Sequence, residues 1–242
     1  MTTRGEKVCQ FIERYCLIPE NSKVGQPIKL LDFQRKFVLD VYDNPAGTSR
    51  AYLSVARKNG KSALIAAIVL AHLVGPEAQQ NSQIISGARS RDQASLVFKL
   101  AEKMVRLSPQ LSNIVRIVPS QKSLVGLPCN VEYKAIYAEA GTAHGLSPTL
   151  AVLDEVGQVR GPNDPFVEAI ETAQGAHHQP LLIAISTQAA TDGDLFSLWL
   201  DDDANSADPR IVSHLYTAPK DCELSDRKAW VARNTSSKSR IK

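Results

Sequence analysis

The apolar positions near the start of the chain recur at the spacing of amphipathic helices. These positions are Val8, Phe11, Ile12, Tyr15 and Cys16. They follow the i, i+3, i+4, i+7, i+8 pattern and so predict a first helix. Residues 17–29 contain two prolines and a glycine, so we expect a connecting loop. A second helix is predicted from about Asp32 to Tyr42, and Asn44-Pro45-Ala46-Gly47 ends it.

Farther along, short apolar runs alternate with longer helical patterns. Strands are predicted over residues 51–56, 83–86, 149–153 and 181–186. Helices are predicted over residues 61–74, 91–107 and 164–173. The β-branched stretches at 114–118 and 131–137 are expected to belong to the same sheet. This alternation predicts an α/β domain of three layers with a mainly parallel central sheet.

The turn between the first strand and helix 61–74 carries a candidate phosphate-binding loop, Ala56-Arg57-Lys58-Asn59-Gly60-Lys61-Ser62. Gly60 would let the backbone approach phosphates, the Lys61 ammonium would reach the β- and γ-phosphates, and the Ser62 hydroxyl would bind Mg²⁺. The full consensus has another glycine five residues before Gly60, where this chain has Val55. Gly-Lys-Ser alone is common by chance, but the flanking strand and helix favour a nucleotide site.

A second motif is Thr149-Leu150-Ala151-Val152-Leu153-Asp154-Glu155. Its apolar run indicates a buried parallel strand that delivers two carboxylates at its carboxyl end, the edge where open α/β sheets bind ligands. Asp154 would hold Mg²⁺ through its water shell, and Glu155 would orient the attacking water. An ordinary strand followed by an N-capping acid is the alternative for an isolated motif. With a phosphate loop upstream, the pair predicts a Mg²⁺-dependent ATPase.

Together these segments resemble a known family, the large terminase subunits that package DNA in tailed bacteriophages. The loop has an arginine just inside it (Arg57) and lacks the first glycine, as the family's loops typically do. Other segments agree with the branch typified by HK97-like phages. They are Leu31-Asp32-Phe33-Gln34, Ser86-Gly87-Ala88-Arg89-Ser90-Arg91-Asp92-Gln93-Ala94, His144-Gly145-Leu146-Ser147-Pro148, and Gln179-Pro180-Leu181 through Ile185-Ser186-Thr187.

The resemblance covers roughly residues 25–200 and implies a P-loop NTPase fold of the ASCE, or RecA-like, class. It divides the chain into an N-terminal helical segment (1–48), an ATPase core (49–220), and a C-terminal helix with a basic linker (221–242). The implied activity is ATP hydrolysis that moves double-stranded DNA into a procapsid. The implied partners are the portal protein, the small terminase subunit and further copies of the chain in a ring, in the cytoplasm of an infected bacterium.

The resemblance also assigns roles within the site. Gln34 would hydrogen-bond the adenine edge, for which its amide offers a donor and an acceptor. Arg57 would pair with phosphate oxygens, whereas Lys58 and Asn59 complete the loop and Lys58 is expected to be exposed. Thr187 would sense the γ-phosphate, with capping of the next turn as an equal alternative.

Ring motors of this type complete the site with an arginine from the adjacent subunit, because the transition state carries extra negative charge. Many terminases have an Arg-Gly pair before the acidic strand, but this chain has His144-Gly145. Neutral imidazole cannot supply a fixed charge at pH 7. The nearest arginines along the chain are Arg89, Arg91 and Arg160. We assign the role to Arg91, which is expected to begin a helix at the active edge.

Composition adds few constraints. The net charge of +3 permits contact with nucleic acid without demonstrating it, and 43% hydrophobic residues are enough for a large core. The four cysteines show no zinc spacing, so reduced and mostly buried thiols are expected. No secretory signal is evident, and the apolar run 63–74 is too short to cross a bilayer.

Several features are weaker candidates. Asp201-Asp202-Asp203 is expected to be a solvated helix end, His177-His178 lacks metal-ligand partners, and Trp199 is expected to pack in the core. Large terminases continue into a nuclease domain, which we do not find here, so no DNA cleavage is expected. Two other functions stay open: a helicase-like P-loop ATPase, and a nucleotide-binding module without turnover.

Overall fold

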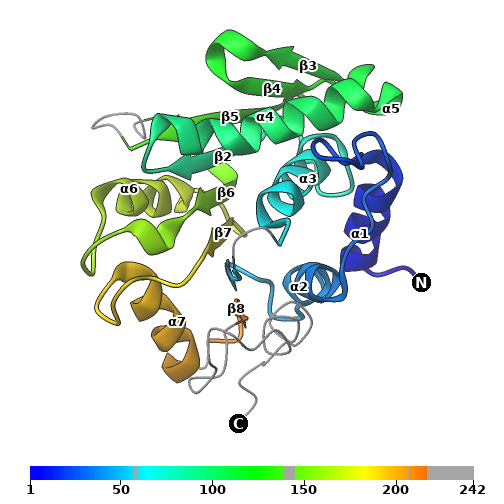
Figure 1. Ribbon diagram of the computed structural model, residues 1–242. Helices are drawn as coiled ribbons and strands as arrows, with labels where there is room; N and C mark the ends of the chain where they lie inside the picture. The colour runs from blue at the N-terminus through cyan, green and yellow to red at the C-terminus, as the bar shows by residue number, and fades with distance from the viewer. Residues whose placement is uncertain (57–58, 139–144, 207, 217–242) are drawn as a thin grey trace.

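One eight-stranded sheet organises the chain in a computed structural model that describes residues 1–56, 59–138, 145–206 and 208–216 (Figure 1). Its order is β3-β4-β5-β2-β6-β7-β1-β8. The six strands from β5 to β8 in this order are parallel, and β3 and β4 extend the sheet with antiparallel pairs. The strands are β1 (Arg50–Ser54), β2 (Gln83–Ala88), β3 (Val115–Val118), β4 (Ser123–Gly126), β5 (Val131–Tyr137), β6 (Pro148–Asp154), β7 (Leu181–Ser186) and β8 (Ile211–Leu215).

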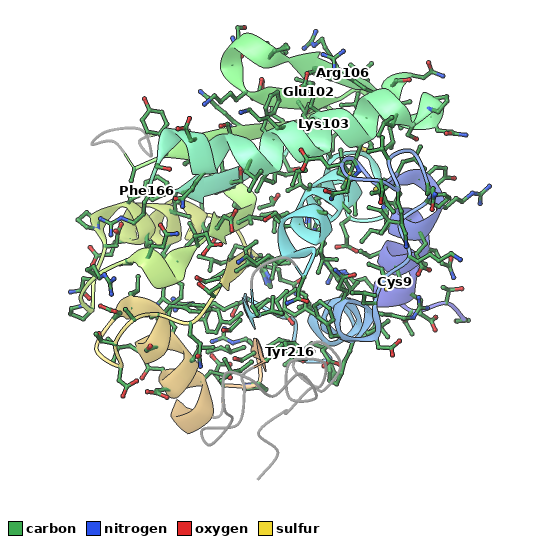
Figure 2. All side chains as sticks on the ribbon, viewed as in Figure 1. Cys9, Glu102, Lys103, Arg106, Phe166 and Tyr216 are labelled. Carbon is green, nitrogen blue, oxygen red and sulfur yellow. The ribbon has the colours of Figure 1, made fainter. Side chains whose placement is uncertain are left out.

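Helices cover the two faces of the sheet, and two buried clusters of side chains lie between the layers (Figures 1 and 2). The larger cluster joins the sheet to α1 (Arg4–Tyr15), α2 (Asp32–Tyr42), α3 (Lys61–Val74) and α4 (Arg91–Leu107). The smaller one joins it to α6 (Pro165–Gln174) and α7 (Leu195–Ser206). The short α5 (Pro109–Ser112) follows α4. The expected three-layer α/β architecture with a mainly parallel sheet is therefore confirmed.

The sheet order brings the two candidate motifs to one edge. β7 pairs with β1 on one side and with β6 on the other, all in parallel. The register places Ser54 beside Ser186 and Asp154 beside Ile185, so the three strands end at nearly the same level. The loop after β1 and the carboxylates after β6 therefore lie one strand apart at the carboxyl edge.

Hydrophobic periodicity gave correct bounds for α2, α3 and α4. α3 has almost no polar face because α1, α4 and the sheet surround it, and its residues from Leu64 to Leu73 are all buried. α1 begins earlier than its apolar stripe because Thr3 and Glu6 form a capping box. The Glu6 N–H donates to Thr3 Oγ1 at 3.1 Å, and the Thr3 N–H donates to the Glu6 carboxylate at 2.8 Å.

Two strands were not predicted. β4 has four residues, and a Cβ on its Gly126 would lie 2.2 Å from the Leu73 carbonyl oxygen, so a small residue interrupts the apolar pattern there. β8 is an edge strand whose partner β1 lies far back in the sequence, so tertiary pairing determines it. Residues 1–48 pack on α3 through α1, and the proposed division at residue 48 stays a prediction. Among the described residues, no helix is both long and apolar enough to span a membrane.

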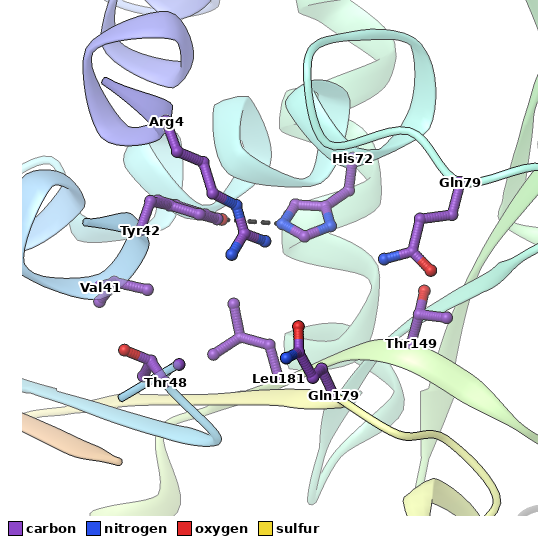
Figure 3. A pocket seen from close by; sticks show the side chains of 10 residues that line it. Arg4, Val41, Tyr42, Thr48, His72, Gln79, Thr149, Gln179 and Leu181 are labelled. Atoms are coloured by element: carbon purple, nitrogen blue, oxygen red, sulfur yellow. Dashed lines mark hydrogen bonds between the residues drawn. The ribbon is translucent and has the colours of Figure 1, made fainter. Parts of the chain in front are cut away.

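At the amino ends of the parallel strands, three helices meet around a small polar cavity (Figure 3). The Arg4 guanidinium of α1 donates to Glu77 at 2.9 and 3.0 Å and lies 5.5 Å from the centre of the Tyr42 ring. The Tyr42 hydroxyl of α2 lies 2.8 Å from Nε2 of His72 in the last turn of α3. Burial lowers the pKa of His72 to about 3, with a smaller contribution from Arg4, so its ring is neutral.

Because His72 is buried as a neutral ring, we expect the folded state to lose stability in acid. A histidine whose pKa is depressed in the folded state binds its proton only after unfolding, so the unfolding free energy decreases as the pH falls from about 6.5 toward 3. One such group contributes a slope of up to about 1.4 kcal/mol per pH unit. His72→Gln keeps a polar partner for Tyr42 but does not titrate. Denaturant unfolding between pH 7 and pH 4.5 is expected to show a shallower pH dependence in this variant, and equal slopes would contradict the assignment.

Candidate active site

The candidate phosphate loop contains a glycine, Gly60, in a backbone conformation that is unfavourable for residues with a Cβ. Gly60 has φ 72° and ψ 14°, in the left-handed region, and forms the N-cap of α3 without a side-chain cap. A Cβ at Gly60 would lie 3.2 Å from Gln34 Nε2. The N–H groups of the first turn of α3 are thus not capped by a Gly60 side chain, which suits a bound anion. Arg57 and Lys58 lie outside the described residues.

The acidic end of β6 lies directly against this loop. Asp154 is the last residue of β6 and is buried, and Glu155 follows with a left-handed φ of 58°. Lys61 Nζ lies 2.7 Å from Glu155 Oε1, with side chains that are 7% and 16% exposed. The pKa of Asp154 is raised to about 6, mainly by burial and also by the charge of Glu155, while Lys61 opposes the rise. Lys61 is therefore the cation that balances this carboxylate pair.

Unpartnered polar atoms are concentrated at this point. In the described part of the chain, four buried side-chain polar atoms lack a hydrogen-bond partner, and three belong to the site: Lys61 Nζ, Asp154 Oδ1 and Glu155 Oε2. The Lys61–Glu155 contact is an ion pair by distance, but its angles are not those of a hydrogen bond. Native proteins seldom leave such atoms unpaired. A polyphosphate oxygen and a hard cation are the groups that would satisfy them.

A cavity of about 330 Å³ adjoins the loop. Its polar wall contains Gln34, Asn59 and Gly60. Gln34 is buried, its Oε1 accepts the Leu31 N–H at 3.0 Å, and its Nε2 donates to the Asn59 carbonyl oxygen at 3.4 Å. The apolar wall comes from the segment before α2, namely Ile18, Pro19, Ile28, Leu30 and Leu31, together with Ala63 and Leu64 of α3. The cavity has the apolar lining and the convergent amide that a nucleobase needs.

The sequence did not reveal this apolar wall. Residues 17–29 were expected to be a connecting loop, and their isoleucines and the two leucines that follow were not assigned to a site. The available signal was the apolar residues that this loop carries beside Gln34, of which Leu31 stays exposed.

The end of β7 contacts the acidic turn through Ser186. The Gly157 N–H donates to Ser186 Oγ at 2.9 Å, and both residues are buried. A Cβ at Gly157 would lie 2.6 Å from Ser186 Oγ and from the Thr187 carbonyl oxygen, so only glycine fits. The Glu155 N–H also donates to the Ile185 carbonyl oxygen at 2.8 Å. Thr187 is half-buried next to this contact, and its role as a sensor stays a prediction.

Comparison with known proteins decides the family. A family model described as "Terminase large subunit, ATPase domain" matches residues 32–201. The large terminase subunit of Enterobacteria phage HK97 is 65% identical over 232 residues, which are 96% of this chain and 46% of that protein. The chain belongs to the family of terminase large-subunit ATPase domains. It spans about half the length of this HK97 relative.

Solved structures agree with this family. The crystal structure of the HK97 large terminase superimposes with a TM-score of 0.91 at 64% identity, covering 96% of this chain and 48% of that one. The ATPase domain of the Thermus phage P74-26 large terminase, in a mutant form, gives a TM-score of 0.60 at 18% identity and 90% coverage of both chains. The large terminase of bacteriophage D6E, solved with ATP-gamma-S, gives 0.54 at 11% identity, covering 76% and 44%. The last two show the fold alone, and the expected P-loop ASCE fold is confirmed.

The three candidate arginines of this ATPase domain have different surroundings. Arg160 lies 3.3 Å from Asp194 of the same chain. Arg89, at the end of β2, donates to the Gln158 carbonyl oxygen at 3.3 Å and lies 3.9 Å from an Asp164 oxygen. Arg91 begins α4 as expected, but its side chain and His144 lie outside what the structure describes. Arg89 and Arg160 therefore have partners in their own chain.

Trp199 and the acidic run Asp201–Asp203 both lie in α7. Within the described ranges, no group of three or more His, Cys, Asp or Glu side chains could hold a metal, and Asp201–Asp203 lie in α7 with the first two exposed. Trp199 is buried and stacks on Tyr52, with 5.4 Å between the ring centroids, so it is a packing residue. The described cysteines, Cys9, Cys16 and Cys129, are free thiols.

Proposed function

We propose that this domain binds and hydrolyses ATP with Mg²⁺ at the carboxyl edge of its sheet, and that hydrolysis drives double-stranded DNA into a procapsid. The observation that carries the proposal is the 2.7 Å contact between Lys61 and Glu155, since it brings a phosphate-loop lysine and a carboxylate pair to one point. The unpartnered atoms at the same place supply independent support.

The base would enter the cavity beside Gln34, and the phosphates would lie at the uncapped first turn of α3. The Gln34 amide keeps one N–H free of its two internal contacts and can donate it to a ring nitrogen of adenine. Arg57 and Asn59 would line the phosphate path, whereas Lys58 would face solvent. The D6E terminase with ATP-gamma-S is a precedent in another member of the fold.

Phosphate binding would exchange the partner of Lys61. The Lys61 ammonium would leave Glu155 for the β- and γ-phosphate oxygens, and the freed carboxylate would accept a hydrogen bond from the attacking water. Asp154 and Ser62 would hold Mg²⁺, which neutralises phosphate charge when bound. Asp154 suits this role because its buried Oδ1 lacks a partner.

A nucleotide-binding module without turnover is the second candidate. Its site would need Lys61 and the loop, but it would not need a second carboxylate after Asp154. Glu155 lies beside Lys61 in a left-handed conformation that costs backbone energy, which favours a catalytic role.

The larger assembly extends this proposal. The portal protein, the small terminase subunit and further copies of the chain in a ring are the partners that a packaging motor requires, in the host cytoplasm and transiently at the portal. Arg91, at the start of α4, would reach the γ-phosphate of the neighbouring subunit, while Thr187 would sense it within the chain. Mixing Arg91→Ala with Glu155→Gln protein should restore part of the turnover. No recovery in preparations that co-assemble would contradict a trans role.

Phosphate release with Mg²⁺ or with EDTA tests the central activity. We expect release to require Mg²⁺ and to rise more steeply than linearly with protein concentration if neighbouring copies complete the site. Tight ATP binding without release at any concentration would favour the binding module.

A further inference from the structure

The turn that follows Glu155 is held on two sides. This turn, Val156–Gln158, is a single 3₁₀ turn closed by the Gln158 N–H, which donates to the Glu155 carbonyl oxygen at 2.9 Å. On the β7 side, Ser186 accepts the Gly157 N–H. On the β2 side, the contacts come from the segment between β2 and the first turn of α4, residues 89–93.

Gln158 makes both contacts with that segment. Its backbone carbonyl oxygen accepts from Arg89 Nη1 at 3.3 Å, and its side-chain Oε1 accepts from Gln93 Nε2 at 3.2 Å. The functions considered so far leave Gln158 without a role. As an exposed residue it contributes little to the core, so packing alone does not explain the two contacts.

The segment 89–93 is itself well anchored. Ser90 caps α4 by accepting the Gln93 N–H at 3.2 Å. Arg89 also approaches Asp164, whose carboxylate accepts the Phe166 and Val167 N–H groups and so caps α6. The segment therefore offers Gln158 a fixed reference between two helices on opposite faces of the sheet.

We propose that Gln158 is a positioning residue for Glu155, through which segment 89–93 sets the direction of the water-orienting carboxylate. This inference rests on the proposed function of Glu155. Lys61 holds the Glu155 side chain through their 2.7 Å contact. Once phosphates bind Lys61, that contact is lost, and the backbone turn must keep the carboxylate aimed. A displacement of Gln158 moves the peptide that carries Glu155, because the two residues are hydrogen-bonded.

Two near-isosteric variants separate the hydrogen bond from side-chain bulk. Gln158→Met keeps the length of the side chain but loses the strong acceptor, whereas Gln158→Glu keeps an oxygen that can accept from Gln93. We expect Gln158→Met to lower kcat about fivefold, as loss of one hydrogen bond implies, without changing KM or the Kd for ATP. Gln158→Glu should restore at least half of the wild-type kcat. Gln121→Ala is the control, because Gln121 is also exposed but lies outside both the turn and segment 89–93.

An unchanged kcat in Gln158→Met would overturn the proposal, and so would equal losses in the Met and Glu variants. Hydrogen exchange of the 155–158 amides gives a reading that does not depend on turnover. Faster exchange there in Gln158→Met and Arg89→Ala, with α3 unchanged, is expected, and unchanged exchange would count against the proposal. Glu155→Gln tests the site itself. If Glu155→Gln loses all turnover and Gln158→Met keeps the wild-type kcat, the positioning role of Gln158 is rejected while the role of Glu155 stands.

Discussion

Glu155→Gln is expected to lower the rate of ATP turnover by roughly 10³-fold or more, while ATP binding stays at least as tight as in the wild type. Glutamine has the size of glutamate but cannot act as the base that orients water. The variant also removes the ion pair that occupies Lys61 in the free protein. The phosphates no longer compete with Glu155 for the ammonium, so affinity for ATP should rise or remain unchanged.

Phosphate release and equilibrium binding of a fluorescent ATP analogue measure the two effects separately. Glu168→Gln, an exposed carboxylate of α6, is the control for loss of one negative charge. Turnover near the wild-type level in Glu155→Gln would exclude Glu155 as the catalytic acid. Loss of ATP binding would instead mean that Glu155 supports the structure of the phosphate loop.

Lys61→Ala is expected to weaken ATP binding by at least about tenfold and to destabilise the fold as well. The first effect follows from loss of a charge at the phosphates. The second arises because Asp154 and Glu155 would lie together in a largely buried site without a cation. Breaking such a pair costs on the order of 3 kcal/mol. The pKa of Asp154, already raised by burial, should rise further.

A double variant separates these effects. Lys61→Ala combined with Glu155→Gln removes both members of the pair, so much of the lost stability should return, while ATP binding should stay weak. Denaturant unfolding and nucleotide titration of the four proteins complete the cycle. Lys99→Ala, on the exposed side of α4, is the control. Additive losses of stability would mean that the Lys61–Glu155 contact contributes nothing in solution.

The sequence predicted those parts of the site that local rules determine. Apolar periodicity located α3 and β6, and the rule that parallel strands end at one edge predicted that Lys61 lies near Asp154. Gly60 was singled out for its lack of a side chain, and the structure gives it a left-handed φ, which glycine adopts readily.

Contacts between distant segments could not be predicted in this way. The Lys61–Glu155 pair and the Gly157–Ser186 hydrogen bond depend on side-chain directions that only the assembled sheet fixes. Ser186 is the last residue of β7, and the period-two pattern of the strand did not indicate that its hydroxyl would accept the Gly157 N–H. β8 depends on pairing with a strand much earlier in the sequence.

A crystal structure of the chain with ATP-gamma-S and Mg²⁺ tests the central claim most directly. We expect the triphosphate at the first turn of α3 and the base in the cavity beside Gln34. Lys61 Nζ should lie within hydrogen-bond distance of phosphate oxygens and more than about 4 Å from Glu155, too far for an ion pair. A nucleotide bound elsewhere, or a Lys61 that still contacts Glu155 beside a bound triphosphate, would contradict the proposed exchange and the ATPase site built on it.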